Sequence, residues 1–512
     1  MAVTIGLDIG TTNWKAAAFT PAGKQVSLRK MPTPTHIAPE GWAYYDPREM
    51  REGFASLLRA VSADCAGQKI LGISVASMTE SVVPLDENGD DLFPIITWYD
   101  TTPRAEAEEV RARMGEKKVF SVCGLDIDPI SSLPKIMWIR NHYPRVFEKA
   151  RVWLQMADYL YFLLCGETVT EYSMAGRTLL FDISKRDWSD EMTGTFGVPR
   201  SVMPRVQAAS SLVGCVHRKA WEATGIPIGT PVFAGGHDHL CASLPTGCLN
   251  GRKMLDSSGT AEAILYFSEK GAPLPAINQG ARVGLYLDPS RYVLWGDIKS
   301  SGASADWAYR TLTTRSDWTG ENEATDYDAV LSACGRLPIG SDGALFLPHL
   351  RGSGAPDWNT DHRGALLNLT DRHSAPYLTR AVFEGLSCQA RVIVEMHRRI
   401  AGAGAEGLCV AGGSSRNLLW QQLKADLLQQ PVELSPIGDA TVQGAALLAA
   451  IGAGEYGSLE EASTACAAGN RVLLPNKENA TACEALYRRY CMANEAMGDL
   501  HCRLARLDRG DS

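Results

Sequence analysis

The sequence predicts an α/β protein made of two domains that are copies of one βββαβα-like unit. The chain has 512 residues, which is too long for a single hydrophobic core. Strand-like runs alternate with apolar patterns of helical period, as α/β folds require. A strand, a turn of small residues and a second strand occur at residues 3–19 and again at 255–267, so we expect the second copy to begin near residue 250.

The composition is that of an ordinary globular protein, with 45% hydrophobic and 21% charged residues. A net charge of -8 without a basic tract argues against nucleic acid or an anionic membrane surface as a partner. No apolar run reaches membrane-spanning length, and the N-terminus lacks the pattern of a secretory signal. The 13 cysteines include no C-x-x-C pair, which favours a reducing compartment, so we expect a cytoplasmic protein.

The first candidate site is the hairpin turn D-I-G-T-T, which starts at Asp8. Its small residues let backbone N–H groups and the hydroxyls of Thr11 and Thr12 approach an anion closely. Asp8 can hold a hydrated Mg²⁺, and Lys15 can offset phosphate charge. The pattern therefore favours a phosphate-binding loop, although a plain tight turn is an alternative explanation.

The next segments predict elements that frame a crevice. Asp46 begins a helix as its N-cap, and Glu49 is expected to complete a capping box. The strand at 70–76 ends just before Thr79 and Glu80, and an Asn-Gly turn at 88–89 leads back to a strand at 94–98.

Acidic residues follow these two strands. Glu80 and Asp100 could therefore reach the crevice that holds Asp8, as contacts for a substrate; a solvated loop carboxylate is the alternative for each. Helices are expected at 135–141 and 152–164, the second ending at Gly166.

The stretch V-F-A-G-G-H-D-H-L-C-A places Asp238 at a strand-to-helix turn. A carboxylate there lies in the crevice where open α/β sheets bind ligands, and it can accept a proton from a hydroxyl. Helix capping is the alternative. His237 and His239 flank the acid. A metal site is disfavoured because alternate residues of a turn diverge, and a substrate contact by one histidine is the better interpretation.

The C-terminal part contains further nucleotide-type turns. Gly259 and Thr260 lie in L-D-S-S-G-T-A-E, which is similar to the first loop, so the two hairpins could clamp a triphosphate across a cleft. A long helix is expected at 376–400. The glycines at Gly412 and Gly413 join a strand to a helix, where a base or ribose can lie against backbone and the helix N-terminus can face phosphate.

Two helices are expected near the end of the chain. The segment at 439–450 is rich in small residues suited to close packing. Beyond about residue 475, a charge-rich helix is expected to form a solvated cover.

Taken in order, these segments resemble those of the FGGY carbohydrate kinases over essentially the whole chain. The matching stretches are D-I-G-T-T, K-I-M-W-I-x-N-H from Lys135, D-Y-L-Y-F-L-L-C-G-E-x-x-T-E-Y-S-x-A-x-x-T-L-L-F-D from Asp158 to Asp182, G-G-x-D at Asp238, S-S-G-T at Thr260, F-L-P-x-L-x-G followed by R-G at Gly364, and A-G-G-S-S-R-N. The resemblance implies an actin-like, ribonuclease H-like fold of two duplicated domains that close over an interdomain active-site cleft. It also implies ATP and Mg²⁺ as cofactors and a sugar or polyol hydroxyl as the acceptor.

The resemblance also assigns roles by position. Asp238 is implied as the catalytic base, and Asp8 and Asp238 as the acids that hold Mg²⁺, directly or through water. The first phosphate loop contains Thr11, Thr12 and Lys15. The nucleotide side is implied to include Gly259, Thr260, Gly302, Gly412, Gly413 and Asn417. The implied substrate side comprises Thr79, Glu80, Asp100, His237 and Asp238.

The substrate side departs from known specificities. Thr79-Glu80 stands where xylulokinases carry Met-His and glycerol kinases carry Arg-Glu, and Ile130 stands where glycerol kinases carry Tyr. Exchanging one buried hydrogen-bonding group changes the accepted hydroxyl pattern strongly. We expect a ketopentose such as xylulose, with glycerol, erythritol, fuculose and gluconate types as alternatives.

The predicted domains are an N-terminal domain at 1–249 with the sugar site and the base, a C-terminal domain at 250–475 with the nucleotide site, and a helical extension at 476–512. The oligomeric state stays open, a homodimer being one option. Two other classes are weighed: an actin-fold ATPase that drives a partner, and an idle sugar sensor. The acid of G-G-x-D and the Lys135 segment favour the kinase over both.

Overall fold

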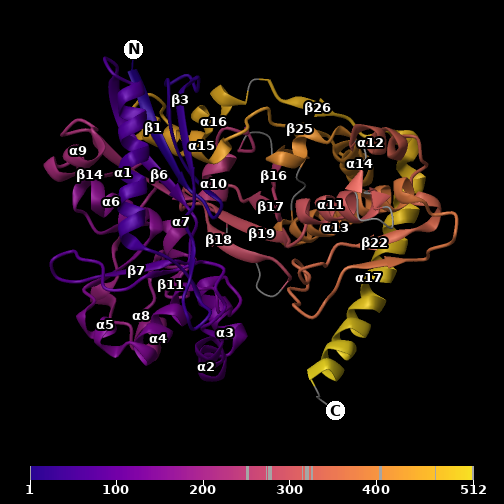
Figure 1. The fold of residues 1–512 in the computed structure, drawn as a ribbon, viewed down its shortest axis with the longest axis horizontal. Coiled ribbons are helices and arrows are strands. Elements are labelled where there is room, and N and C mark those ends of the chain that lie inside the picture. Colours follow the sequence, from indigo (N-terminus) through magenta and orange to yellow (C-terminus); the bar gives the residue numbers. More distant parts are fainter. Residues whose placement is uncertain are drawn as a thin grey trace.

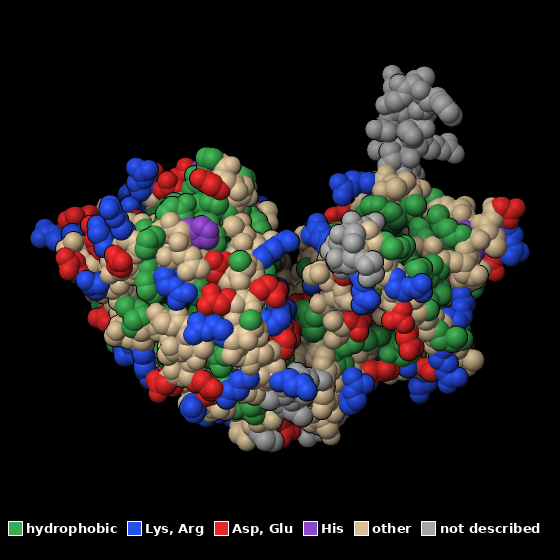
Figure 2. All heavy atoms as spheres, turned by 90° about the horizontal axis from the view of Figure 1, so that it is seen from below, with side chains coloured by type: hydrophobic (Ala, Val, Ile, Leu, Met, Phe, Trp, Pro, Cys, Tyr) green, Lys and Arg blue, Asp and Glu red, His purple; other side chains and the backbone are tan. Residues whose placement is uncertain are grey.

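The computed structural model describes residues 2–249, 253–272, 274, 279–313, 315–316, 322–323, 327–402, 406–467 and 469–509. The N-terminal half (residues 2–249) and the C-terminal half (residues 253–509) form two lobes, each around its own large sheet (Figure 1). Seen from below, the surface is hollowed between the two lobes (Figure 2). The predicted extension at 476–512 lies within the described residues only up to 509.

The N-terminal sheet has the strand order β14-β15-β6-β1-β2-β3. Strand β1 pairs antiparallel with β2 and parallel with β6, and β15 pairs parallel with β6. The strands are β1 (Ala2–Ile9), β2 (Asn13–Phe19), β3 (Gln25–Pro32), β6 (Lys69–Ser77), β14 (Leu212–Cys215) and β15 (Pro231–His237). Val3, Ile5, Leu7 and Ile9 of β1 are fully buried, because helices cover both faces of this sheet.

The C-terminal sheet repeats this plan. Its order is β18-β19-β17-β16-β24-β25-β26, and β16 pairs antiparallel with β17 and parallel with β24. Three antiparallel strands followed by two parallel ones occur in both halves in the same chain order, with β18 added beside β19 in the C-terminal half, which confirms the predicted duplication. The strands are β16 (Lys253–Ser258), β17 (Glu262–Phe267), β18 (Arg282–Leu285), β19 (Tyr292–Ile298), β24 (Gly407–Ala411), β25 (Val432–Leu434) and β26 (Arg471–Leu473).

Helix α15 (Ala440–Gly452) belongs to the C-terminal half in sequence but packs on β1 and β6 of the N-terminal sheet (Figure 1). Glycines make this close approach possible. A Cβ atom on Gly6 would lie 2.0 Å from the carbonyl oxygen of Val442, and one on Gly444 would lie 1.9 Å from that of Cys241. The small-residue helix predicted here is confirmed, and it fastens the two halves together.

The remaining elements surround the sheets. The helices are α1 (Pro47–Asp64), α2 (Arg104–Met114), α3 (Glu116–Cys123), α4 (Ser132–His142), α5 (Pro144–Lys149), α6 (Met156–Cys165), α7 (Tyr172–Ala175), α8 (Asp190–Phe196), α9 (Arg218–Thr224), α10 (Asp238–Ser243), α11 (Gly302–Ala308), α12 (Tyr327–Gly335), α13 (Ala375–Ala401), α14 (Leu418–Leu428), α16 (Leu459–Cys466) and α17 (Ala480–Arg509). The short strands are β4 (His36–Ile37), β5 (Ala43–Tyr45), β7 (Val82–Leu85), β8 (Ile95–Ile96), β9 (Val152–Gln155), β10 (Val169–Glu171), β11 (Phe181–Asp182), β12 (Asp187–Trp188), β13 (Arg205–Gln207), β20 (Arg315–Ser316), β21 (Asn322–Glu323), β22 (Leu345–Leu347) and β23 (Ala365–Leu367).

Two local predictions are wrong. Asp46 caps α1 by accepting a hydrogen bond from the Arg48 amide, but no capping box forms, because Glu49 pairs with Nε2 of His36 at 2.6 Å. The helix expected at 152–164 begins only at Met156, since residues Val152–Gln155 form β9 and pair with β7.

The hairpin expected to follow Asn88 is also different. The turn forms, with an isolated bridge between Leu85 and Asp91, but β8 pairs with β5 instead of returning along the preceding strand. Both β8 and β9 therefore take partners that are remote in sequence.

Helix α17 is more than a solvated cover. Its first half buries Cys483, Leu486 and Tyr490 against α13, α14 and β22. Farther along, His501 is also buried and accepts from the Arg363 amide, and only the end of the helix extends beyond the lobe (Figure 1). The predicted charged helix exists, but one face of it completes the C-terminal core. Among the described residues, no helix combines the length and apolarity that a bilayer crossing needs.

Candidate active site

The ends of three parallel strands bring the predicted catalytic acids to one edge of the N-terminal sheet. Ile9 of β1 and His237 of β15 both lie beside Ser77 of β6. Asp8 precedes the first of these positions, and Asp238 follows the second. The carboxyl edge of a parallel sheet is where α/β proteins bind ligands.

Asp238 is the first residue of α10, and its side chain is held through one of its own carboxylate oxygens. Oδ1 accepts a hydrogen bond of 2.7 Å from the backbone N–H of His239 and lies 3.2 Å from Nε2 of His237. Within the described residues no hydrogen bond reaches Oδ2, and the side chain is 25% exposed. Burial raises the pKa of this carboxyl group. One fixed oxygen and one open oxygen suit a general base.

Asp8 is buried beside the first loop. Burial raises its pKa to about 7, against the opposing charge of Lys15 and with the neighbouring charge of Asp238. Lys15 lies 3.5 Å from Asp8 and 3.0 Å from Asp439, which precedes α15. Because the charge of Asp238 raises the proton affinity of Asp8, a cation beside this pair would be favoured.

This pair fits a hydrated Mg²⁺, which needs only one or two protein carboxylates when phosphate and water supply the other oxygens. Groups of three or more metal-binding side chains do not occur in the described residues. Any ion there would therefore need additional ligands from the substrate or from solvent.

Glu80 is held in place by its neighbours. Nε and Nη2 of Arg177 lie 2.7 and 2.6 Å from its Oε1, and the Thr79 hydroxyl donates to its Oε2. Its φ of 66° is unusual for a residue with a side chain. Fixed contacts thus hold this carboxylate on the turn that follows β6, on the predicted sugar side.

Lys135 of the K-I-M-W segment supports the turn that contains Glu80. Its side chain is fully buried, and Nζ donates to the carbonyl oxygens of Ile130, Trp98 and Glu80 at 2.6, 3.0 and 3.3 Å. Burial lowers its pKa to about 7. Lys135 therefore orders backbone around the sugar side.

Asp100 has a different environment from Glu80. Its Oδ2 accepts from the Ala43 amide at 2.7 Å, and its Oδ1 accepts from the Thr102 amide at 2.8 Å. Both oxygens thus hold the loop, and a contact of Asp100 with substrate stays a prediction. The neighbouring Trp98 donates 2.7 Å to the Thr11 hydroxyl, which ties this loop to the first phosphate loop.

The histidines beside the base contact the C-terminal half. The ring of His237 stacks on Trp295 of β19, with centroids 4.9 Å apart and planes at 26°. Burial lowers the pKa of His237 well below its usual value. Nδ1 of His239 lies 3.1 Å from the Ser257 hydroxyl of β16. Neither contact was predicted.

The two phosphate-type turns are open at their tips. Thr12 is exposed, and so are Gly259 and Thr260. The amide of Gly302 donates 3.1 Å to the Gly259 carbonyl, and a Cβ on Gly302 would lie 2.4 Å from that oxygen. The structure therefore joins the predicted second loop to the turn that starts α11.

A cavity of about 390 Å³ lies on the predicted nucleotide side. Gly412 and Gly413 line it, and so do two segments that sequence reasoning missed, 434–438 and Arg471. Gly412 has a φ of 102°, and a Cβ there would strike the Ser258 carbonyl, 2.3 Å away. Asn417 caps α14 by accepting from the Trp420 amide, beside this wall.

A buried ionic cluster joins these nucleotide-side segments. Nζ of Lys424 in α14 lies 2.5 Å from Asp256 and 2.9 Å from Glu262. Glu262 also accepts 2.6 Å from the hydroxyl of Ser301, which precedes Gly302. The cluster holds β16, β17, α11 and α14 together under the loops.

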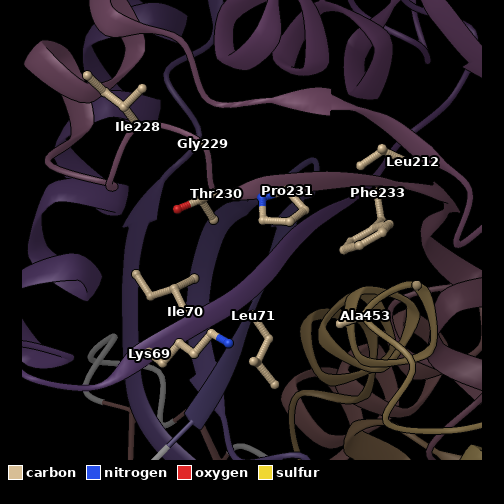
Figure 3. Close-up of a pocket in the computed structure, with 11 residues that line it drawn as sticks. Lys69, Ile70, Leu71, Leu212, Ile228, Gly229, Thr230, Pro231, Phe233 and Ala453 are labelled. Carbon is tan, nitrogen blue, oxygen red and sulfur yellow. The ribbon is translucent and has the colours of Figure 1, made fainter.

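A second cavity, of about 620 Å³, lies at the other edge of the N-terminal sheet (Figure 3). It is lined by the starts of β6 and β15 and by Ala453 beyond α15. Because Asp238 follows the opposite end of β15, this cavity is separate from the predicted catalytic acids.

Sequence reasoning missed several site residues, and only some left a signal. Arg177 lies inside the matched segment that begins at Asp158, so its place there could have marked it. Trp295 and Ser257 come from strands whose position relative to Asp238 depends on how the halves pack. Such contacts leave no local pattern.

The N-terminal domain model of the FGGY family of carbohydrate kinases matches residues 3–245, and the C-terminal domain model matches residues 255–453. The L-fuculokinase of Escherichia coli K12 is 28% identical over 470 residues, covering 90% of this chain and 94% of its own. The xylulose kinase of Bacillus subtilis is 28% identical over 468 residues, with 90% of each chain covered. The gluconokinase of Bacillus subtilis is 25% identical over 461 residues, covering 90% of this chain and 89% of its own.

Solved structures show the same fold. Ligand-bound xylulose kinase from Lactobacillus acidophilus superimposes with a TM-score of 0.89 at 22% identity, covering 98% of this chain and 100% of that one. Plasmodium falciparum glycerol kinase with ADP gives 0.86 at 21% identity, covering 96% and 98%. The predicted two-domain actin-like fold is thereby confirmed. With both domain models matched across most of its length, the chain belongs to the FGGY family of carbohydrate kinases and is a sugar kinase.

Proposed function

We propose that this kinase transfers the γ-phosphoryl group of ATP to a hydroxyl of a small sugar, a ketopentose of the xylulose type being the first candidate. The observation that carries the proposal is the open Oδ2 of Asp238. Asp238 follows β15 at the sheet edge, where the charge of Glu80 acts on it and its own charge acts on Asp8. A base in that position can take the proton of a hydroxyl as it attacks phosphorus.

Different residues of the chain would bind the sugar, the phosphate groups and the metal ion. Glu80 and Arg177 offer an acceptor and donors fixed in one orientation, which suits neighbouring hydroxyls of a sugar. The exposed turns at Thr12 and Thr260 offer backbone N–H groups to phosphate oxygens. Asp8 and Asp238 would hold Mg²⁺, which neutralises charge on the transferring phosphate when bound. Positioning and charge neutralisation account for most of phosphoryl-transfer catalysis.

The glycine-lined cavity is proposed as the adenosine site. Gly412 and Gly413 present backbone without side chains, so a flat base and a ribose can lie against them. Asn417, at the start of α14, is proposed to orient the same wall. Gly259 and Gly302 are proposed to fix the second phosphate loop.

The sugar is the open part of the proposal. Relatives at similar identity carry the names L-fuculokinase, xylulose kinase and gluconokinase, and a glycerol kinase shares the fold. The Thr79-Glu80 pair with Arg177 matches neither the Met-His nor the Arg-Glu pattern. A cytoplasmic location is also proposed; the cysteines of the described residues are all free thiols, which supports it.

A coupled assay of ADP release tests the proposal. Purified protein is given ATP and Mg²⁺ with a panel of pentuloses, hexuloses, aldonates and polyols, and xylulose is expected to give the largest kcat/KM. Preference for another compound would replace the ketopentose. Thermal shift by a sugar without any ADP release would indicate a sensor, and sugar-independent ADP release would indicate an ATPase.

A further inference from the structure

Two histidines hold the base, and each is tied to the C-terminal half. The amide of His239 and Nε2 of His237 both meet Oδ1 of Asp238, at 2.7 and 3.2 Å. The ring of His239 contacts Ser257 of β16, and the ring of His237 stacks on Trp295 of β19. The orientation of the carboxylate therefore depends on the other sheet.

The contact between His237 and Asp238 needs a defined ring orientation. A neutral imidazole can donate to the carboxylate through Nε2 only if the proton is on that nitrogen. Nδ1 then becomes an acceptor, and it is buried without a hydrogen-bond partner in the described part of the chain. Ring contacts therefore set its plane: the indole of Trp295 stacks on it, and the ring of His239 meets it edge-on, with centroids 5.6 Å apart.

The same indole also meets the sugar-side pair. The guanidinium of Arg177 lies 5.7 Å from the Trp295 ring, and Arg177 is the residue that fixes Oε1 of Glu80. Cation–π contacts of this kind favour one guanidinium orientation. One buried side chain from β19 thus touches both the group that orients the base and the group that orients the sugar contact.

We propose that Trp295 is a positioning residue for the transfer reaction: its ring holds His237 and Arg177 so that Oδ2 of Asp238 faces the accepting hydroxyl held by Glu80. The inference rests on the proposed function and adds to it a residue from the C-terminal sheet. Alignment of the base then depends on how that sheet is placed against β15.

Kinetics of Trp295→Leu and Trp295→Phe test this role, with the best sugar of the panel as substrate. Trp295→Leu keeps an apolar side chain but removes the ring, so we expect kcat to fall about 10- to 100-fold, as misplaced reacting groups cause, while the KM for ATP changes less than about twofold. Trp295→Phe keeps a ring and should recover most of kcat. Trp188→Leu is the matched control, because Trp188 is also 6% exposed but packs on Phe181.

A second measurement does not need turnover. Carbethoxylation of His237 by diethyl pyrocarbonate, mapped by mass spectrometry, should rise several-fold in Trp295→Leu and stay at the wild-type level in Trp188→Leu. An unchanged His237 reactivity in Trp295→Leu, or a kcat within about twofold of wild type, would overturn the proposal. Absence of sugar-dependent ADP release in the wild type would instead refute the proposed function, and the modification experiment would still decide whether the indole holds His237.

Discussion

Two nitrogens of Arg177 contact a single oxygen of Glu80: Nε and Nη2 lie 2.7 and 2.6 Å from Oε1. The two residues are 97 positions apart, and the carboxylate is 5% exposed while the guanidinium is 15% exposed. An ion pair so far from solvent fixes orientation more than it adds stability. In the proposed function, this pair would present a rigid polar surface to sugar hydroxyls.

Replacing Glu80 by Gln should raise the KM for the sugar at least about tenfold, because a site built to hydrogen-bond one group discriminates strongly against its loss. The KM for ATP should change little. Steady-state kinetics with each substrate varied in turn measures both values. Glu49→Gln is the control, since Glu49 pairs with His36 on the surface of the protein. Equal rises in the two KM values would remove Glu80 from the sugar side.

Asp238→Ala should lower kcat by about 10²- to 10⁴-fold, which is the usual contribution of a general base. Binding of ATP, measured by calorimetry, should stay near the wild-type value, because the nucleotide cavity is lined by residues of the C-terminal half. Asp64→Asn, which alters the exposed pair with Arg29, serves as the control. Turnover within tenfold of wild type would show that another group accepts the proton.

Local signals predicted much of the fold and the acids of the site. The D-I-G-T-T turn, the strand that ends at Asp238 and the Gly412 turn each depend on neighbours in sequence, so pattern and turn chemistry suffice for them. The resemblance supplied the roles.

Other parts depend on partners that only the fold brings together. The apolar run at Val152 forms a strand because β7 lies beside it, and a short apolar run does not distinguish a strand from a helix. Glu49 pairs with His36 of another element instead of completing the expected capping box. Both carboxylate oxygens of Asp100 accept hydrogen bonds from backbone amides. Trp295 reaches His237 across the two halves. Spacing along the chain carries no record of such contacts.

Filling the glycine-lined cavity should weaken nucleotide binding selectively. A Cβ on Gly413 would meet no atom within 4 Å, so Gly413→Leu is tolerated by the protein itself but projects into space proposed for adenosine. We expect the Kd for ATP to rise at least about tenfold while the sugar's Kd holds. Gly194→Leu, at a similarly open helical position, is the control. Unchanged ATP affinity would place the nucleotide elsewhere.

The docking of α17 should weaken in mild acid. Nε2 of His349 lies 2.7 Å from the side-chain oxygen of Asn494 in α17, and burial lowers the pKa of His349 to about 4, with His362 and His501 adding to the effect. An unfolded histidine has a pKa of about 6.5, so the unfolded chain binds more protons between these values. The contribution of His349 to the free energy of unfolding is then fully present above pH 6.5, and it is lost as the pH falls from 6.5 toward 4.

Urea unfolding at pH 7.5, 6 and 5 measures this effect. In His349→Gln, which cannot take up that proton, the loss of stability between pH 7.5 and 5 should be smaller than in wild type. His373→Gln is the control, because His373 is only half-buried, on a loop. Parallel pH profiles for wild type and His349→Gln would show that another group dominates the acid sensitivity.

Substitution of Lys424 tests how a buried charge affects the stability of the protein. Its side chain is fully buried between Asp256 and Glu262. Burial alone would lower its pKa, but the charges of the two carboxylates outweigh it and raise the pKa of this lysine. Lys424→Met would leave two adjacent carboxylates without a counter-charge. Removing one partner of a buried pair typically costs about 3–5 kcal/mol, and we expect a loss of that order in urea unfolding.

The double variant Lys424→Met/Asp256→Asn separates charge from packing. Because it removes one of the two stranded carboxylates, it should be more stable than Lys424→Met alone if electrostatics causes the loss. Glu262 also holds the hydroxyl of Ser301 beside Gly302, so the KM for ATP should rise in the single variant and recover in part in the double one. If the double variant is no more stable than the single one, Lys424 stabilises the protein through its packing. The charge balance beneath the proposed second phosphate loop would then not be the source of its stabilising effect.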